Sequence, residues 1–369
     1  MEMSSQREIR AIDPTWTLAQ FSAHLTSALN GDGPALALAP ISDTVVPSEI
    51  ALAVSTSGST GGAKEVGLSS AALLLSANAT NDFFGANAGQ TWSLLLPLTH
   101  IAGINVLVRS LELGTVPIDA REITGAYATA DFTAIVPTQL FRALNGDKDL
   151  LAHLLSAKSV LVGGAALDKT LGEQARAAGI NIVESYGMTE TCGGCIYDGL
   201  PIGDTAVEIN SDGLIKISTS TLATTYLNDA TDWKNKVADG FFQTSDLGEI
   251  IGGKLRVLGR ADDVIVSGGE NISLVQVENI IHQTFSGIEC AAFAVADPQW
   301  GQSLQLAIAG SVKPETSAIN EVLSTQISAA AKIKGFIYLD KLPRTALDKV
   351  DRQELAKTLQ IEKAAQSNE

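Results

Sequence analysis

The stretch Ser55–Lys64, with the sequence STSGSTGGAK, indicates the fold of this chain more clearly than any other segment. It holds five hydroxyl side chains and three glycines, and it ends on a lysine. Glycines leave backbone N–H groups unshielded, hydroxyls and amides donate hydrogen bonds to phosphate oxygens, and a lysine adds positive charge. An apolar run, Ile50 to Val54, precedes the stretch, and a helix is predicted over Ser69 to Asn81 after it. We therefore interpret Thr56 to Lys64 as a loop that binds a polyphosphate.

This loop differs from the Walker pattern, in which Gly-Lys is followed at once by Ser or Thr. Here Lys64 follows Ala63 and precedes Glu65. A flexible linker has a similar Ser/Gly composition and is the alternative interpretation. The flanking apolar segments and the terminal lysine favour the phosphate loop.

The composition is that of a globular protein. The chain has 369 residues, of which 45% are hydrophobic and 18% charged, so it is long enough for two or three domains. A net charge of −16 argues against nucleic acid or an anionic membrane as a partner, because both need a basic patch. Three cysteines provide no disulfide framework and suit the reducing cytoplasm.

The chain shows no sign of a targeting or membrane segment. Residues 1–15 lack the apolar core of a signal peptide. No apolar run approaches the roughly 20 residues of a membrane span. We therefore expect a cytoplasmic protein without a membrane span; a homo-oligomer is left open.

Strand-like and helix-like segments alternate through the first half of the chain. Apolar runs that end at Pro, Gly or a polar residue predict strands at Trp92–Leu96, Phe132–Val136, Ser159–Val162 and Ile180–Val183. Helices are predicted at Leu18–Leu29, Gly103–Leu113 and Asp168–Ala178. The alternation predicts a large α/β domain with mostly parallel sheets covered by helices.

The pattern changes near Ile202, where hairpin signals at Ser211-Asp212-Gly213 and Gly252-Gly253 predict a β-rich subdomain. Beyond Gly259 the sequence predicts a compact α/β unit with helices at Leu274–Thr284 and Thr316–Ala330. Its strands are predicted at Ala291–Val295, Leu304–Ile308 and Phe336–Leu339. We therefore predict a large domain over residues 1–259 and a small C-terminal domain over 260–369.

Four further segments carry residues suited to nucleotide chemistry. They are Glu184–Thr191 (ESYGMTET), Thr244–Gly248 (TSDLG), Gly259–Glu278 and Pro343–Arg352 (PRTALDKVDR). The first offers a tyrosine to stack on a base and a glutamate, whose hard oxygens suit Mg²⁺. The second offers a carboxylate, Asp246, which is expected near a strand end and suits a ribose diol. Each segment alone also has an ordinary structural interpretation. These are a polar loop for the first, a strand-edge turn for the second, a linker with a strand for the third and a surface lysine for the fourth.

Taken in order, these five segments resemble the adenylate-forming superfamily of acyl-CoA synthetases, luciferases and peptide-synthetase adenylation domains. The resemblance runs from about Leu52 to Arg352. Within the superfamily the chain is most similar to the 2-succinylbenzoate–CoA ligases of menaquinone biosynthesis, through Leu96–Gly103 (LPLTHIAG) and Val266–Ile272 (VSGGENI). The N-terminal region is shorter than in most of the superfamily.

The resemblance implies a ligase that uses ATP, Mg²⁺ and CoA and has a small carboxylic acid, 2-succinylbenzoate, as its substrate. It implies nucleotide-binding roles for Thr56, Ser57, Gly58, Ser59, Thr60, Gly61, Lys64, Gly163, Gly164, Tyr186, Gly187, Thr189, Asp246 and Arg260. Glu190 would hold Mg²⁺, and Gly268 and Gly269 would meet CoA. Lys349 matches the catalytic lysine, and His100 lies where the family lines its acyl pocket. Asp262 lies at the matching hinge, where the small domain would swing between two reaction steps.

The chain departs from the superfamily pattern at several positions. Asp348 stands where glycine usually precedes the catalytic lysine, and Ala63 replaces a frequent proline. Arg142, Thr99 and Gln139 are candidates to bind the remote carboxylate of the acid. The pair Cys192 and Cys195 is weak evidence for a metal site because no second pair accompanies it. Another aryl- or acyl-CoA ligase, or an inactive nucleotide-binding relative, is the alternative function.

Overall fold

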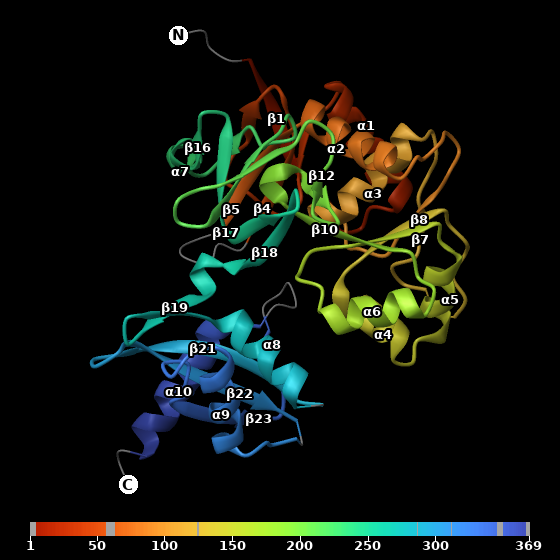
Figure 1. Ribbon diagram of the computed structural model, residues 1–369. Helices are drawn as coiled ribbons and strands as arrows, with labels where there is room; N and C mark the ends of the chain where they lie inside the picture. The colour runs from red at the N-terminus through yellow and green to blue at the C-terminus, as the bar shows by residue number, and fades with distance from the viewer. Residues whose placement is uncertain are drawn as a thin grey trace. The chain divides into compact units, whose positions relative to one another are not determined.

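The computed structural model describes residues 5–56, 63–123, 125–285, 287–310, 312–344 and 350–366. The chain divides into two compact units, Met1–Thr244 with Gly248–Val257 and Ser245–Leu247 with Leu258–Glu369 (Figure 1). Each unit has its own hydrophobic core. Within the described residues, no helix combines the length and apolar character that a transmembrane span requires.

The first sheet of the first unit has six strands in the order β15-β5-β4-β2-β1-β3. Its centre is parallel, whereas β3, β5 and β15 pair antiparallel with their neighbours. The β4–β5 pairing places Thr56 opposite Lys64, so both ends of the predicted phosphate loop leave the sheet at one place. The strands are β1 Gln6–Ala11, β2 Ala35–Ala37, β3 Val45–Pro47, β4 Ile50–Thr56, β5 Lys64–Ser69 and β15 Thr225–Tyr226.

The second sheet has seven strands in the order β12-β11-β10-β9-β8-β6-β7. The strands from β10 to β7 run parallel, and β11 and β12 add an antiparallel edge. The parallel strands read as short apolar runs because helices cover both of their faces. The strands are β6 Trp92–Leu94, β7 Ile118–Asp119, β8 Phe132–Ile135, β9 Ser159–Val162, β10 Ile182–Met188, β11 Gly193–Tyr197 and β12 Leu200–Pro201.

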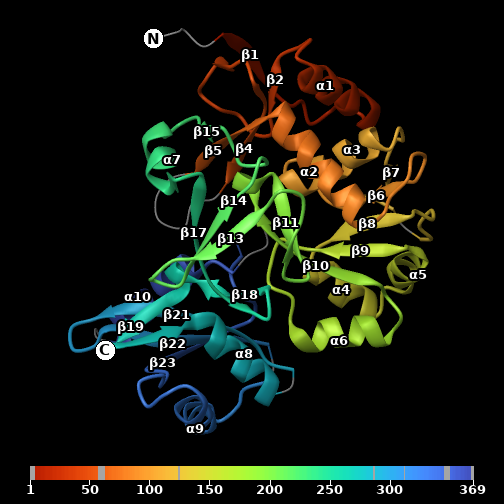
Figure 2. The same cartoon turned by 45° about the horizontal axis from the view of Figure 1, so that its top comes forward.

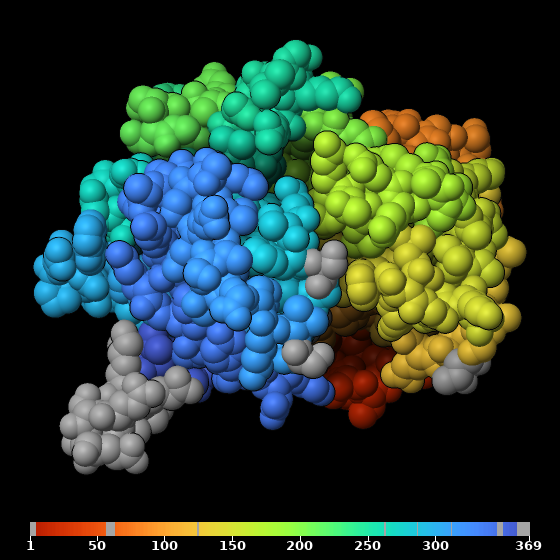
Figure 3. All heavy atoms as spheres, turned by 60° about the horizontal axis from the view of Figure 1, so that its bottom comes forward, coloured from red at the N-terminus to blue at the C-terminus, as the bar shows by residue number. Residues whose placement is uncertain are grey.

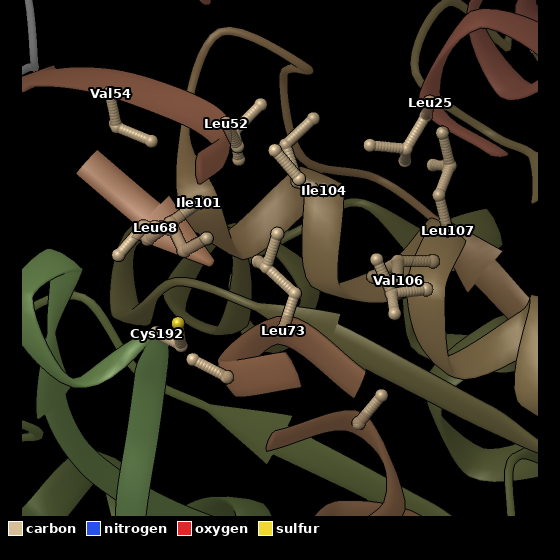
Figure 4. Packing of buried hydrophobic residues seen from close by; sticks show 14 of the residues in the cluster. Leu25, Leu52, Val54, Leu68, Leu73, Ile101, Ile104, Val106, Leu107 and Cys192 are labelled. Carbon is tan, nitrogen blue, oxygen red and sulfur yellow. The ribbon is translucent and has the colours of Figure 1, made fainter. Parts of the chain in front are cut away.

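Helices α2 (Ser70–Phe83) and α3 (Ile101–Glu112) form a layer shared by these two sheets. One buried cluster joins residues of both helices to Leu68 of the first sheet and Phe132 of the second. Figure 4 shows Leu73 of α2 and Ile104 of α3 within this cluster, together with Leu25 of helix α1 (Leu18–Asn30). The two sheets therefore share one core.

Gly103 sets the close approach of α3 to the segment before it. A Cβ at this position would lie 2.3 Å from the carbonyl oxygen of Pro97, which is far inside van der Waals contact. Only glycine permits this packing. It fixes the start of α3 and therefore the position of His100, which is the N-cap residue of that helix.

Three helices, α4 (Pro137–Leu144), α5 (Lys148–Ser156) and α6 (Lys169–Ala177), cover the other face of the second sheet. Figure 2 shows them beside β8, β9 and β10, and in Figure 3 this region, yellow to yellow-green, forms one continuous surface. Leu140 and Leu154 pack there against Val160. The parallel sheet is thus covered on both faces.

A third sheet has the order β13-β14-β17-β16, and β18 pairs with β17. Ile215 and Leu255 from this sheet pack with Ile196 of β11, so the antiparallel edge of the second sheet supports it. The elements are β13 Ala206–Ile209, β14 Leu214–Ser218, α7 Ala230–Lys236, β16 Val237–Ala238, β17 Phe241–Ile251 and β18 Lys254–Arg260.

The second unit is built on a sheet of order β20-β19-β22-β21, with β23 also paired to β22. Helices α8 and α9 pack in one apolar cluster, and α10 packs in a second one around Phe293 and Ile337. The elements are β19 Val264–Ser267, β20 Glu270–Ser273, α8 Leu274–Thr284, β21 Glu289–Asp297, β22 Gly301–Ala309, α9 Thr316–Gln326, β23 Gly335–Leu339 and α10 Arg352–Gln366.

The predicted fold class is confirmed, but two segments were assigned wrongly. Glu184 to Met188 continue strand β10 instead of forming a loop after it, because they pair with β11. Asp246 lies in the middle of the long strand β17, not near a strand end or in a turn. The strands β1, β2 and β3 were not predicted from the sequence: β2 and β3 have only three residues each, and β1 carries charged residues among its six.

Candidate functional site

Lys64 lies at the start of β5, where its side chain meets two residues from a distant part of the chain. Its ammonium group forms an ion pair with Asp232 of α7 and lies 4.5 Å from the centre of the Tyr226 ring. The lysine side chain is one-quarter exposed. A cation over an aromatic face is attracted by the ring electrons, so the ring and the carboxylate together hold the lysine. Of the other loop residues, Thr56 ends β4, and Ser57, Gly58, Ser59, Thr60 and Gly61 lie outside the described residues.

Glu190 occupies a short 3-10 turn, Thr189–Thr191, directly after β10. The turn is anchored from behind: the Ala223 N–H donates to the Glu190 carbonyl at 2.8 Å, and the Thr221 hydroxyl donates to the Thr191 carbonyl at 3.1 Å. Thr191 is fully buried, and its hydroxyl bonds the carbonyls of Met188 and Gly193 on either side of the turn. These bonds fix the backbone of Thr189 and Glu190.

Tyr226 connects Glu190 to Lys64. Its hydroxyl donates to Oε1 of Glu190 at 2.8 Å, while its ring lies under the Lys64 ammonium group. Burial, and then the neighbouring charge of Glu190, raises the pKa of the Tyr226 phenol well above its usual value. The tyrosine therefore keeps its proton and acts as a donor to the carboxylate.

The glycines expected beside adenine directly follow the carboxyl end of β9 and lie next to the middle of β10. Val162 and Glu184 are paired across these strands, so Gly163-Gly164 and Ser185-Tyr186 follow side by side. A Cβ on Gly163 would lie 3.2 Å from the Ser185 side chain, and Gly164 has a φ of +82°, which favours glycine. Carboxyl ends of parallel strands are the usual ligand-binding edge of such sheets.

Gly187 allows β10 and β11 to approach closely. The register shifts between Tyr186 and Gly187, and a Cβ at Gly187 would lie 2.0 Å from the carbonyl oxygen of Gly193. A side chain there would force the two strands apart. Gly187 thus sets the path of the chain from Tyr186 into the Thr189–Thr191 turn.

His100 caps α3 at the carboxyl-end side of β6. Its Nδ1 lies 2.9 Å from the Thr99 hydroxyl. The candidates for the remote carboxylate have other partners: Arg142 pairs with Asp147 at 3.0 Å, and the Gln139 amide donates to the Leu95 carbonyl at 3.2 Å. Each contact uses only part of the donor group, since a guanidinium has five N–H donors and an amide has two.

The second unit holds the expected ribose pair and the glycine turn. Asp246 and Arg260 form an ion pair at 3.5 Å. Gly268 and Gly269 have φ of +62° and +84° and form the two-residue turn between β19 and β20, as a type I′ hairpin requires. The Gly268 N–H donates to the Trp300 carbonyl at 3.1 Å, which ties the turn to the neighbouring connection.

Lys349 and Asp348 lie outside the described residues, and so does the side chain of Asp262. The backbone around residue 262 forms the turn Ala261–Asp263. Arg344 and Val350 form an antiparallel bridge, and the Asp351 N–H donates to the Pro343 carbonyl at 2.8 Å. The two ends of the segment that carries Lys349 are therefore tied to each other.

The two neighbouring cysteines do not form a metal site with other described residues. Cys192 and Cys195 are both buried, and burial raises the pKa of the Cys195 thiol to about 12. Across the described ranges, no group of three or more His, Cys, Asp or Glu side chains could hold a metal ion. These thiols therefore serve as small apolar side chains of the core.

The surroundings of Glu190 fit Mg²⁺, which takes oxygen ligands and usually keeps several waters beside one or two carboxylates. Only one of its carboxylate oxygens, Oε1, accepts the Tyr226 hydroxyl, and the residue is partly exposed. Oε2 has no hydrogen-bond partner among the described residues. A single carboxylate oriented in this way can hold the ion together with phosphate oxygens.

Tyr226 and Asp232 were not predicted from the sequence as residues of the site. Tyr226 lies in the polar run TTYLNDATDWK, and its hydroxyl bonds to a residue 36 positions away. Asp232 is 168 positions from Lys64. The available signal was an aromatic residue within a polar run, followed by Asp229, which caps α7, and by Asp232 in the first turn of that helix.

Residues 5–220 match the family model described as AMP-binding enzyme, which is more than half of the chain. The chain belongs to this family. The resemblance inferred from the five sequence segments is therefore confirmed.

Several curated proteins similar to this chain are named 2-succinylbenzoate–CoA ligases. The chain is 34% identical over 362 residues to the probable 2-succinylbenzoate–CoA ligase of Mycobacterium tuberculosis, with 90% of this chain and 93% of that protein covered. It is 26% identical to the 2-succinylbenzoate–CoA ligase of Lactococcus lactis, with 83% of this chain and 71% of the relative covered. The match to the mycobacterial protein extends over nearly the full length of both chains.

The fold also matches a solved member of the family. The o-succinylbenzoate CoA synthetase of Bacillus subtilis, solved with an acyl-adenylate intermediate, superposes with a TM-score of 0.75 at 22% identity. The match covers 94% of this chain and 78% of that one. This likeness shows that the two chains share the adenylate-forming fold.

Proposed function

We propose that this chain is an AMP-forming acid–thiol ligase that joins 2-succinylbenzoate to CoA through an acyl-adenylate, as a step of menaquinone biosynthesis. The observation that carries the proposal is the nearly full-length match to the mycobacterial ligase. We place the reaction in the cytoplasm, where ATP and CoA are available and free thiols stay reduced.

The first chemical step joins two anions. The acid carboxylate attacks the α-phosphorus of ATP, a bond forms between them, and pyrophosphate leaves. Transfers of this kind depend on positioning and on neutralising negative charge. We assign the β- and γ-phosphates to the Thr56–Lys64 loop and the α-phosphate to Thr189. Lys349 would bridge the carboxylate and the α-phosphate, and such a preorganised donor is worth about 3–4 kcal/mol in the transition state.

Glu190 would hold Mg²⁺, and the bound ion would neutralise charge on the phosphates. Tyr186 and the Gly163-Gly164 segment would enclose adenine, with Gly187 setting the chain path beside it. Asp246 and Arg260 would bind the ribose. Lys64 forms an ion pair with Asp232, so ATP binding has to replace or share that ion pair.

The second step forms the thioester. The CoA sulfur attacks the activated carbonyl, and AMP leaves with the electron pair of the broken carbon–oxygen bond. We assign Gly268 and Gly269 to the CoA path and His100 to the acyl pocket. A general base is not required, because a thiol is partly ionised near neutral pH. Residue 262 would be the hinge between the two steps.

The test is a panel of carboxylic acids with ATP and CoA, in which thioester mass and AMP are measured together. We expect both products with 2-succinylbenzoate at the highest kcat/KM. A higher value with another aromatic or aliphatic acid would reassign the substrate, and AMP formation with no acid would refute the ligase assignment.

Lys349→Ala separates the two steps. We expect pyrophosphate release to fall at least about 100-fold, since a donor of this kind is lost. Thioester formation from supplied acyl-adenylate should largely persist. Lys341→Ala, an exposed lysine of the same unit, is the matched control and should leave both steps unchanged. Equal loss of both steps in Lys349→Ala would contradict the assigned role.

A further inference from the structure

Tyr226 contacts two of the residues assigned to ATP and its metal, although it belongs to none of the five sequence segments. Its side chain is 1% exposed. Its hydroxyl donates to Oε1 of Glu190 at 2.8 Å, and the Lys64 ammonium group lies 4.5 Å from the centre of its ring. A buried aromatic residue with only a packing role does not need either contact.

The position of this ring is strongly constrained. Tyr226 pairs with Val66 across β15 and β5, so its backbone is part of the first sheet. Trp233 of α7 packs edge-on against the ring with centres 5.1 Å apart, and Phe242 stacks on Trp233 at 5.3 Å. These contacts fix the position of the hydroxyl, and the hydroxyl donates its hydrogen bond to Glu190 from that position.

We propose that Tyr226 is a positioning residue for nucleotide and metal binding: its hydroxyl holds Oε1 of Glu190 and thereby orients the carboxylate that would take Mg²⁺. The ring, together with Asp232, holds Lys64 ready at the end of the phosphate loop. This inference rests on the proposed function, which assigns Mg²⁺ to Glu190 and phosphate to Lys64. Partners that orient a metal-binding side chain typically change metal affinity 10- to 100-fold when they are removed.

Tyr226→Phe tests the hydroxyl alone, because it keeps the ring and therefore the packing on Trp233 and the contact to Lys64. The measurement is calorimetric binding of ATP without acid or CoA, at a series of Mg²⁺ concentrations and also in EDTA. We expect the Mg²⁺ concentration for half-maximal enhancement of ATP binding to rise about 10-fold or more. Binding in EDTA should stay within about twofold, since the cations and the loop remain.

Tyr197→Phe is the matched control. Tyr197 is also fully buried in the first unit, and its hydroxyl lies 2.9 Å from that of Thr80, with no contact to Glu190. Tyr197→Phe removes a buried hydroxyl, as Tyr226→Phe does, so both variants should show a similar fall in melting temperature. Only Tyr226→Phe should change the Mg²⁺ requirement.

The outcomes separate this inference from the proposed function. An unchanged Mg²⁺ requirement in Tyr226→Phe, with Mg²⁺-dependent ATP binding intact in the unmodified protein, would overturn the role of Tyr226 alone. Failure of the unmodified protein to bind ATP in a Mg²⁺-dependent way would overturn both. The double variant Tyr226→Phe/Glu190→Gln is compared with Glu190→Gln alone. The same Mg²⁺ requirement in both supports the inference, and a higher requirement in the double variant contradicts it.

Discussion

Arg352 and Glu278 form a partly buried ion pair that should determine the stability of the second unit. Arg352 Nη2 lies 2.9 Å from Glu278 Oε1, its Nε donates to the Ala292 carbonyl at 2.9 Å, and its Nη1 lies 3.6 Å from Asp263. Glu278 Oε1 also accepts the Ala292 N–H at 2.8 Å. One guanidinium thus joins the start of α10 to α8, β21 and the Ala261–Asp263 turn.

Arg352→Met removes the charge but keeps an apolar stem, and leaves Glu278 buried without its cation. Breaking a buried pair in this way costs about 3–5 kcal/mol. We expect the lower end, about 3 kcal/mol, because the Arg352 side chain is 28% exposed and solvent screens part of the interaction. Glu278→Gln keeps an acceptor for the Ala292 N–H, so the double variant should recover most of the lost stability.

The effect should depend on pH. Burial raises the pKa of the Glu278 carboxyl above its unfolded value, and Arg352 opposes that rise. Without the arginine the folded pKa rises further, so folding then favours the protonated acid. The stability of the variant is therefore closest to that of the unmodified protein below the unfolded pKa of about 4.3. The stability of the variant is then lost as the pH rises through the folded pKa of the Glu278 carboxyl.

Hydrogen exchange of the full-length protein, read by mass spectrometry, separates the two units. Amides of α8 and β21 that exchange by opening of this unit should exchange about 100-fold faster in Arg352→Met at pH 7, which corresponds to about 3 kcal/mol. Amides of α3 in the first unit serve as the internal reference. A change below fivefold at pH 7, or a deficit that grows as the pH is lowered, would refute the reasoning.

Three further predictions concern the first unit. His153 is buried and burial lowers its pKa below the usual 6.5, so its contribution to stability should be full above that pH and be lost as the pH falls through the lowered pKa of the folded state; urea unfolding of His153→Gln should show a flatter pH dependence. Gly187→Ala places a Cβ 2.0 Å from the Gly193 oxygen, so we expect a loss of about 1–3 kcal/mol in urea unfolding and ATP binding too weak to detect by calorimetry; normal binding would contradict the site. Leu73→Ala removes a fully buried side chain and should cost about 2–5 kcal/mol in urea unfolding, whereas Leu75→Ala, 47% exposed on the same helix, should cost less than about 0.5 kcal/mol.

The sequence predicted those parts of the molecule whose signal is local. The helix after the phosphate loop and the strand at Ser159–Val162 follow from apolar periodicity with clear end signals. The family followed from the order of five polar segments. Strands such as β2 and β3, three residues each, carry too little pattern to be recognised and are stabilised by their neighbours in the sheet.

The contacts that orient the site could not be predicted from spacing. Glu190 meets Tyr226, and Lys64 meets Asp232, only because β15 joins the first sheet next to β5. Such pairings depend on the tertiary fold and leave no periodic trace in the chain. Likewise, Asp246 was expected near a strand end, and Asp and Gly are common in turns, yet strand pairing overrides that preference.

The indole of Trp233 has a consequence for how ligand binding can be observed. It is 8% exposed, packs on Tyr226, and follows Asp232, the partner of Lys64, directly in the chain. Displacement of that carboxylate by an incoming phosphate changes the electric field at the ring. The protein thus contains an intrinsic fluorophore beside the residues that hold Lys64, and its emission offers a label-free optical signal for nucleotide titration and stopped-flow kinetics.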